Sequence, residues 1–432
     1  MEGTRCNPVV VLYFILAAII PSSSTSMSQI AAVDRRLVDK KKNGCVAYNA
    51  IDKCWRCDPN WAKNRKRLAD CAKGFGHGTY GGKLGRIYVV NDCSDNDMVN
   101  PKPGTLRHAV LLPEPLWIIF SGTMNIKLRQ ELIFTCDKTI DGRGFEVHIS
   151  GGAGFMLQFV RNIIIHGVHM YDIVEKSGGM IRSEPDHVGI RGKSDGDAIS
   201  IFKSSQIWVD HCSFANSYDG LIDIVAASTN ITISNCHFVK HDKALLFGAS
   251  AEMPEDKIMK VTLAYNHFGK GLTQRLPAVR FGFVHVVNND YTQWKSYAIG
   301  GGDGATIISQ GNRFIAPDGA CKEVTNRRQV PESVWRKWTW RSEGDLLLNG
   351  AYFRESGNPH WAKTYKGPPL IPAQPAESVA KLTKSVGAYL GCKQVSNDRA
   401  STPATGIATI DFGDLNTEAI FLFVSAWLLM KV

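Results

Sequence analysis

Apolar residues recur along the chain in an eight-residue pattern that appears six times. The copies occupy residues 163–170, 207–214, 231–238, 261–268, 284–291 and 307–314, with starts 44, 24, 30, 23 and 23 residues apart. Several copies open with alternating apolar residues, so we expect each to begin with a β-strand. A period in the low twenties made of short strands is typical of a solenoid.

Two positions of the pattern carry the same kind of side chain in successive copies. Position six is asparagine in the last three copies, and position eight is large and mostly aromatic: Met170, Phe214, Phe238, Phe268, Tyr291 and Phe314. Because stacked coils place like residue on like residue, the sequence predicts an aromatic stack inside and an asparagine ladder at a turn. We therefore expect an all-β protein, a right-handed parallel β-helix with loop extensions and a short N-terminal helical segment. The alternative is a β-sandwich whose spacing is coincidental.

Charged residues follow the copies at similar offsets. Asp219 and Lys243 each lie 12 residues after the start of their copy, and Asp197 lies 22 residues before Asp219, about one coil. Adjacent coils are separated by roughly 4.8 Å, the strand spacing of any sheet. We therefore expect one column on one face, running from acidic to basic: Asp197, Asp219 with Asp223, Lys243, then Arg275 and Arg280.

The acidic end of this column predicts a metal site. Carboxylates brought close together repel one another unless a cation compensates them. Oxygen ligands without Cys or His favour a hard cation, and an open, partly hydrated set favours Ca²⁺. A straight strand would point Leu221 outward between Asp219 and Asp223, and a bend at Gly220 would relieve this. The alternative is that these aspartates are ordinary turn residues.

A series of motifs in a fixed order gives the chain a family resemblance over roughly residues 45–392. They lie at residues 54–61, 85–90, 103–108, 139–144, 194–197, 208–211, 219–223, 241–243, 275–280 and 340–345, and include Trp208-Val209-Asp210-His211, Asp219-Gly220-Leu221-Ile222-Asp223 and Arg275-x-Pro277-x-x-Arg280. The chain resembles the plant pectate lyases of polysaccharide lyase family 1, the group that includes pollen allergens.

This resemblance implies a set of site residues and a reaction. The calcium carboxylates of the family match Asp197, Asp219 and Asp223, and Asp195 matches a further acidic position. Arg275 matches the catalytic arginine that abstracts a proton, and Lys243 and Arg280 match residues that bind substrate carboxylates. The family cleaves de-esterified (1→4)-α-D-galacturonan by β-elimination, leaving 4,5-unsaturated oligogalacturonides. Because a guanidinium normally stays protonated, this role of Arg275 predicts an alkaline optimum.

Two other functions remain open from the sequence. A non-catalytic pectin-binding wall protein could use the same fold, and Phe281 and Ala249 stand where relatives often carry histidine. A polygalacturonase would need paired carboxylates acting as acid and base, which the column of basic residues disfavours. Asp210 and His211 could suggest a hydrolase dyad, but the pattern places His211 near a coil corner, so we expect a structural histidine.

Charge and cysteines point to an extracellular protein. The net charge of +10 suits an anionic polymer, and we find no recognised nucleic-acid module. Residues 1–26 resemble a signal peptide, and the ten cysteines beyond Cys6 suit a disulfide-permissive compartment, although a zinc site at Cys54 and Cys57 is an alternative. Asn230 begins a glycosylation sequon.

These features suggest an organisation of the whole chain. We expect a Cys-rich lead-in at residues 27–80 with a helix-like stretch over 61–71, and a β-helix domain over 81–392. Residues 393–432 fit a linker and a GPI-attachment signal, which would place a monomeric protein in the cell wall or at the outer face of the plasma membrane.

Overall fold

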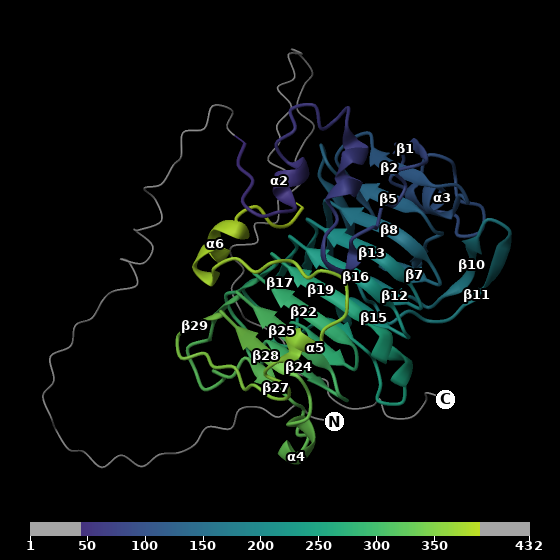
Figure 1. Cartoon of the computed structure of the whole chain (residues 1–432). Helices are drawn as coiled ribbons and strands as arrows, with labels where there is room; N and C mark the ends of the chain where they lie inside the picture. The colour runs from purple at the N-terminus through teal and green to yellow at the C-terminus, as the bar shows by residue number, and fades with distance from the viewer. Residues whose placement is uncertain (1–44, 389–432) are drawn as a thin grey trace, which may run out of the picture. The chain divides into compact units, whose positions relative to one another are not determined.

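Residues 45–388 are described by a computed structural model. Three long parallel sheets wind around a common core as a right-handed parallel β-helix, which confirms the predicted fold class (Figure 1). Every neighbouring pair of strands in these three sheets is parallel, and consecutive strands of one sheet come from successive coils. The antiparallel hairpins of a β-sandwich are absent from these sheets, so the alternative fold is wrong.

Each complete coil contributes one strand to each of the three sheets, and the first and last coils contribute fewer. The ten-stranded sheet contains, in spatial order, β1 (Arg86–Val90), β2 (Leu116–Phe120), β5 (Lys138–Asp141), β8 (Arg161–His166), β13 (Ser205–Asp210), β16 (Thr229–Ser234), β19 (Lys260–Ala264), β22 (Phe283–Val287), β25 (Thr306–Gln310) and β28 (Trp340–Glu343). The nine-stranded sheet contains β3 (Met124–Ile126), β6 (Val147–Ser150), β9 (Val168–Tyr171), β14 (Ser213–Ala215), β17 (His237–Val239), β20 (His267–Phe268), β23 (Asp290–Tyr291), β26 (Arg313–Ile315) and β29 (Leu346–Leu348). The eight-stranded sheet contains β4 (Leu132–Ile133), β7 (Phe155–Gln158), β12 (Ile199–Phe202), β15 (Gly220–Val225), β18 (Lys243–Phe247), β21 (Ala278–Arg280), β24 (Ile299–Gly302) and β27 (Thr325–Asn326).

The register of the ten-stranded sheet follows the predicted repeat. Ile207 pairs with Ile163 on one side and Ile231 on the other, and the same row continues through the first residue of each later copy. Position eight falls in the nine-stranded sheet. There the rings of Phe214, Phe238, Phe268, Tyr291 and Phe314 stack in sequence, with centroids 4.5 to 5.2 Å apart. The predicted aromatic stack is confirmed.

The predicted asparagine ladder is also present. Asn266 Nδ2 donates to Asn289 Oδ1 at 2.9 Å, and Asn289 Nδ2 donates to Asn312 Oδ1 at 3.0 Å. Asn312 Nδ2 in turn donates to Asp345 Oδ1 at 3.1 Å, so a carboxylate ends the ladder. Because all three asparagines are fully buried, these bonds satisfy polar groups that water cannot reach.

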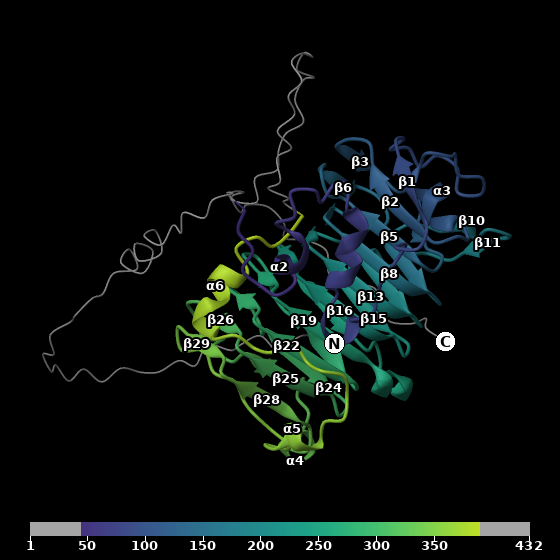
Figure 2. The same ribbon diagram turned by 45° about the horizontal axis from the view of Figure 1, so that its top comes forward.

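The lead-in lies along the outer face of the ten-stranded sheet, as both views show (Figures 1 and 2). It contains α2 (Asp52–Trp55), η2 (Arg65–Cys71) and η3 (Gly74–Gly76). The helix-like stretch over residues 61–71 is shorter than predicted and is a 3₁₀ helix. Disulfides join Cys45 to Cys57 and Cys54 to Cys71, so the alternative of a zinc site at Cys54 and Cys57 is wrong.

A second apolar cluster joins the lead-in to the sheet and to residues 371–388, here called the closing segment. It contains Trp55 and Leu68 of the lead-in, Trp208 of β13, and Ile371 and Leu382. The closing segment includes η5 (Ala376–Ser378) and α6 (Val379–Leu382), and the carbonyl of Leu382 accepts a hydrogen bond from Asn49 Nδ2 at 3.1 Å. The two ends of the described chain therefore meet on one face of the coil stack.

The loop extensions account for the remaining elements. The antiparallel hairpin of β10 (Gly179–Glu184) and β11 (His187–Arg191) leaves the stack between β9 and β12. Short helices lie at α3 (Leu106–Leu111), η4 (Pro254–Ile258), α4 (Glu332–Trp335) and α5 (Trp361–Thr364). Among the residues described, none of the helices has the length and apolar character needed to cross a membrane. The predicted signal peptide at residues 1–26, Cys6 and the predicted tail at 393–432 lie outside the described residues.

Candidate active site

Every residue of the predicted column lies in a strand of the eight-stranded sheet or shortly before one. Asp197 lies two residues before β12, Asp219 immediately before β15, and Asp223 within it. Lys243 begins β18, Arg275 lies three residues before β21, and Arg280 ends that strand. Because β12, β15, β18 and β21 are successive neighbours in the sheet, the structure arranges these residues from acidic to basic across adjacent coils.

The carboxylates converge around Gly220. Asp197 is 6% exposed, and its Oδ1 accepts a 2.7 Å hydrogen bond from the Gly220 amide, while its Oδ2 accepts one of 2.8 Å from Ser200. A Cβ at Gly220 would lie 2.5 Å from Asp223 Oδ1 and 2.9 Å from Asp197 Oδ1. Only glycine therefore leaves room for both oxygens. Leu221 is fully buried, and the bend expected at Gly220 accompanies the start of β15.

These oxygens fit a bound cation. Burial, with the charges of Asp195 and Asp219, raises the pKa of Asp197 to about 7. Burial and the charges of Asp197 and Asp219 raise the pKa of Asp223 well above its usual value. The buried Asp223 Oδ1 accepts no hydrogen bond from any residue in 45–388. Such a cluster gains most from a hard cation bound by oxygen ligands, which is the preference of Ca²⁺.

Lys243 and Asp219 join the acidic and basic halves of the site. Lys243 Nζ lies 3.0 Å from Asp219 Oδ1, and both side chains are partly exposed. His241 Nε2 lies 2.6 Å from the backbone oxygen of Asp219, which fixes the chain just before β15. Lys243 therefore reaches the groove beside the carboxylate cluster.

Arg275 lies next in the column. Its φ of +60° is in the left-handed region, and its carbonyl accepts a 2.7 Å hydrogen bond from the Leu245 amide. The Leu276–Pro277 peptide that follows is cis. The positive charge of Arg275 acts on both neighbours, since it lowers the pKa of Asp223 and that of Arg280. Arg275 thus lies between the carboxylates and the last arginine of the column.

Arg280 is held in place by its surroundings. Its Nη1 donates to the carbonyl oxygens of Gly248 at 3.2 Å and Ala249 at 2.6 Å, and its Nε lies 3.4 Å from Asp303 Oδ2. Burial, with the positive charges of Arg328 and Arg275, lowers the pKa of Arg280. The guanidinium therefore lies in a region of surplus positive charge, which favours an anionic ligand.

The sequence reasoning missed three supporting residues. Ser200, His241 and Asp303 hold Asp197, Asp219 and Arg280 respectively. Ser200 lies three residues after Asp197, and His241 begins the motif at residues 241–243. A search for polar residues close to the site residues in the sequence could therefore have found both. Asp195, which was predicted, is exposed beside Asp197.

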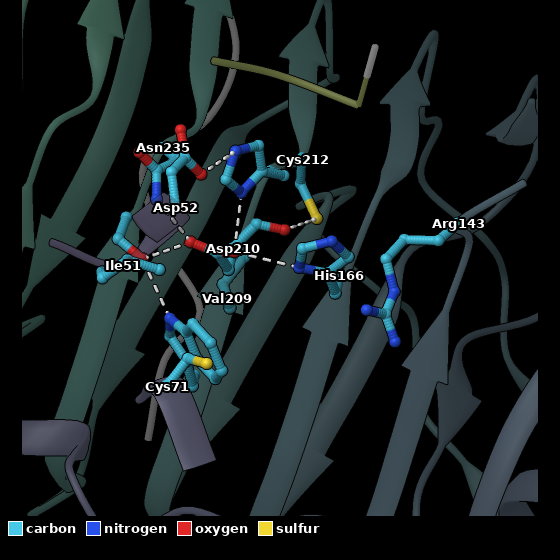
Figure 3. Close-up of polar contacts among 12 residues, drawn as sticks. Ile51, Asp52, Cys71, Arg143, His166, Val209, Asp210, Cys212 and Asn235 are labelled. Carbon is cyan, nitrogen blue, oxygen red and sulfur yellow. Dashed lines mark hydrogen bonds and ion pairs between the residues drawn. The ribbon is translucent and has the colours of Figure 1, made fainter. Parts of the chain in front are cut away.

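Two other candidates lie on the ten-stranded sheet, not on the sheet that carries the column. Asp210 Oδ2 lies 2.7 Å from His211 Nδ1 and 2.9 Å from His166 Nδ1, and Figure 3 shows Asp210 at the centre of this network. His211 is fully buried, which agrees with a structural histidine. Asn230 is half-buried at the second position of β16, and its glycosylation stays a prediction.

The fold and the site together define a class of protein: a parallel β-helix with an acidic cluster and a basic row on one sheet. The Pectate lyase family matches residues 120–333. A pectate lyase of Nicotiana tabacum is 57% identical over 385 residues, covering 88% of this chain and 96% of that protein. A pectate lyase of Lilium longiflorum is 55% identical over 361 residues, covering 83% of each chain.

A solved structure agrees with these sequence relatives. The crystal structure of jun a 1, the major allergen from cedar pollen, is 42% identical, with a TM-score of 0.75, and the match covers 79% of this chain and 99% of that one. The chain therefore belongs to the pectate lyase family, whose members are enzymes.

Proposed function

We propose that this chain is a calcium-dependent lyase that cleaves pectate by β-elimination. One observation carries the proposal: an orphaned buried carboxylate oxygen at Asp223 lies beside a row of three basic side chains on the same sheet. A hydrolase would instead need two carboxylates, one acid and one base, on either side of the glycosidic bond. Here Lys243, Arg275 and Arg280 lie beside the carboxylate cluster instead. The pectate lyases of tobacco and lily support the same substrate class.

The carboxylates would hold the cation and part of the substrate. Asp197, Asp219 and Asp223 are the ligands we propose, with Asp195 at the exposed edge of the cluster. Bound Ca²⁺ would withdraw charge from the substrate carboxylate and so make the adjacent C5–H more acidic. The Gly220 amide and Ser200 hydroxyl keep Asp197 turned toward this position.

The basic residues would bind the substrate and take the proton. Lys243 and Arg280 would pair with galacturonate carboxylates and stabilise the charge that develops there in the transition state. Arg275 would abstract the C5 proton, the C4 oxygen would leave, and a 4,5-unsaturated sugar would remain.

We also propose a place of action in the plant cell wall. The two disulfides of the lead-in support an oxidising compartment, and the net charge of +10 favours association with an anionic polymer. Attachment through a GPI anchor, glycosylation at Asn230 and a monomeric state remain predictions from the sequence. Mass spectrometry of protein purified from a plant host would test the first two.

The ultraviolet absorbance of unsaturated products tests the proposed reaction. Wild-type protein incubated with polygalacturonate and Ca²⁺ should give a steady rise in absorbance, and EDTA should abolish it. Cleavage that produces reducing ends without this absorbance would identify a hydrolase. Binding of polygalacturonate without any cleavage, from neutral to alkaline pH, would identify a pectin-binding protein.

A further inference from the structure

The strand that follows Arg280 in the sheet ends in three glycines. β24 reads Ile299-Gly300-Gly301-Gly302 and lies between β21 and β27. The position of a Cβ at Gly300 is filled by the ring of Tyr297, whose Cε2 is 2.3 Å away. At Gly302 a Cβ would meet only Cη2 of Trp338, at 3.9 Å. The end of β24 beside Arg280 is therefore open.

Arg328 comes just after β27 (Thr325–Asn326), the strand next to β24. Arg280 pairs with Gly302, and Gly300 pairs with Asn326. Arg328 follows two residues after the end of β27. Because Arg280 ends β21 and Arg328 follows β27, the two arginines belong to coils two apart, about 10 Å at the usual strand spacing. The strand between them ends at Gly302, and Asp303, which follows it, lies 3.4 Å from Arg280 Nε.

Arg328 differs from the arginine that precedes it. Arg327 is buried, and its guanidinium lies 4.3 Å from the ring centroid of Trp335 and 4.4 Å from that of Trp340. Arg328 is half-buried, with a φ of +49°. Within residues 45–388 its side chain makes no hydrogen bond or ion pair, and only its amide is bonded, to Asn326 Oδ1 at 2.7 Å. A positive charge is thus presented without a protein partner.

The charge of Arg328 reaches the proposed active site. Among the charged neighbours of Arg280, Arg328 does most to lower the pKa of that guanidinium. Arg280 Nη1 is held on the β18 side by the carbonyls of Gly248 and Ala249, and its Nε lies 3.4 Å from Asp303 Oδ2, just after β24. Arg328 lies farther along the sheet, after β27. A single carboxylate on Arg280 would leave Arg328 free for a second one.

We propose that Arg328 is a substrate-binding residue, which pairs with the carboxylate of the galacturonate next to the one held by Arg280. This inference rests on the proposed function, because it assigns a further position for the same polymer. A partly solvated charge-assisted hydrogen bond of this kind should change affinity about threefold to tenfold. Arg328 would therefore favour long, de-esterified stretches of pectate over short or methylated ones.

Kinetics with oligogalacturonates of increasing length test this role. Arg328→Gln should raise KM about threefold to tenfold for oligomers long enough to reach Arg328, leave kcat nearly unchanged, and leave short oligomers unaffected. Arg328→Lys should recover part of the loss. Arg336→Gln is the matched control, since it removes the same charge from an exposed arginine that follows α4 and pairs with Glu332.

Binding to an inactive protein gives an independent reading. In the Arg275→Ala background, calorimetry should show the same length-dependent loss for Arg328→Gln. Equal behaviour of Arg328→Gln and Arg336→Gln at every length, or an equal loss at all lengths, would overturn the role of Arg328 while wild-type cleavage still supported the proposed function. A wild-type protein that neither cleaves nor binds polygalacturonate would overturn both.

Discussion

At the scale of single residues, the acidic cluster depends on Gly220, which has no side chain. Gly220 gives its amide to Asp197 and leaves room for Asp223 at its α-carbon. Any Cβ there would collide with oxygens of both carboxylates. The Gly220 amide and the Ser200 hydroxyl hold Asp197, so its carboxylate has little freedom to move aside.

Gly220→Ala should therefore weaken calcium binding while the protein still folds. Displacement of Asp223 and Asp197 should lower calcium affinity about tenfold to a hundredfold, as for changes next to metal ligands in general. Isothermal calorimetry with Ca²⁺ would measure the loss. Gly122→Ala is the control, because a Cβ at Gly122 meets no atom within 4 Å. Unchanged affinity in Gly220→Ala would argue against this cluster as the calcium site.

The sequence predicted the site residues because they occur at coil offsets and in family motifs. It did not predict Asp303 as the partner of Arg280. That ion pair depends on a left-handed turn at Asp303, which follows the three glycines of β24, and no periodic pattern marks it. The sequence of a glycine-rich strand gives little information about which side chains of adjacent coils lie against it.

At the scale of secondary-structure elements, one corner of the coil is held by two kinds of residue. Position five of all six copies has a positive φ: Gly167, His211, Asn235, Tyr265, Asn288 and Gly311. Position six follows it, with the asparagine ladder in the last three coils. The left-handed residue turns the chain, and the asparagine side chains bond the buried backbone groups that the turn leaves unpaired.

Asn289→Ala should destabilise the coil stack by about 2–4 kcal/mol, because it leaves buried partners on both sides without hydrogen bonds. Asn289 Oδ1 accepts from the amide and the side chain of Asn266, and its Nδ2 donates to Leu263 O at 2.9 Å. Urea denaturation followed by circular dichroism would measure the change. Alanine at the exposed Asn91 should have almost no effect, and an equally small effect at Asn289 would contradict the ladder's role.

The repeat pattern predicted the strands well and the insertions poorly. Interior side chains must match from coil to coil, so their spacing is visible in the sequence. The 44-residue interval between the first two copies contains the β10–β11 hairpin, and the 30-residue interval before residue 261 contains η4. These extensions lie outside the stack, where no neighbouring coil imposes a period.

At the scale of the whole molecule, a buried charge network fastens the lead-in to the β-helix. His211 Nε2 lies 3.0 Å from Asp52 Oδ1 of the lead-in, and its Nδ1 lies 2.7 Å from Asp210 Oδ2. Two carboxylates this close to the ring favour the protonated imidazole, although Arg56 Nη1 also lies 3.4 Å from His211 Nε2. Burial lowers the pKa of His211, but Asp210 and Asp52 outweigh it and raise the pKa to about 9.

This network predicts that stability falls at alkaline pH. The folded-state pKa of His211 is raised above the unfolded value of about 6.5, so its contribution is full below that pH and is lost as pH rises through about 9. Denaturation at a series of pH values should show a decline of roughly 3 kcal/mol across this range. Asp52→Asn should flatten the decline, and a wild-type profile that stays level would contradict a charged His211.

The sequence could not place the lead-in on the sheet. Asp52 and His211 are 159 residues apart, and neither belongs to a pattern that links the two segments. The predicted helix-like stretch over 61–71 is present only as a 3₁₀ helix over Arg65–Cys71. That segment packs through Leu68 and Cys71 against the sheet and is held by the Cys54–Cys71 disulfide, so local helical periodicity does not set its conformation.

The most direct test of the whole account is a comparison of cleavage and binding in Arg275→Ala. If Arg275 abstracts the proton, the variant should bind calcium and oligogalacturonate like the wild type. Its rate of unsaturated product formation should fall about a hundredfold to ten-thousandfold. A variant that still forms the unsaturated product at the wild-type rate would contradict the assignment of Arg275 as the base.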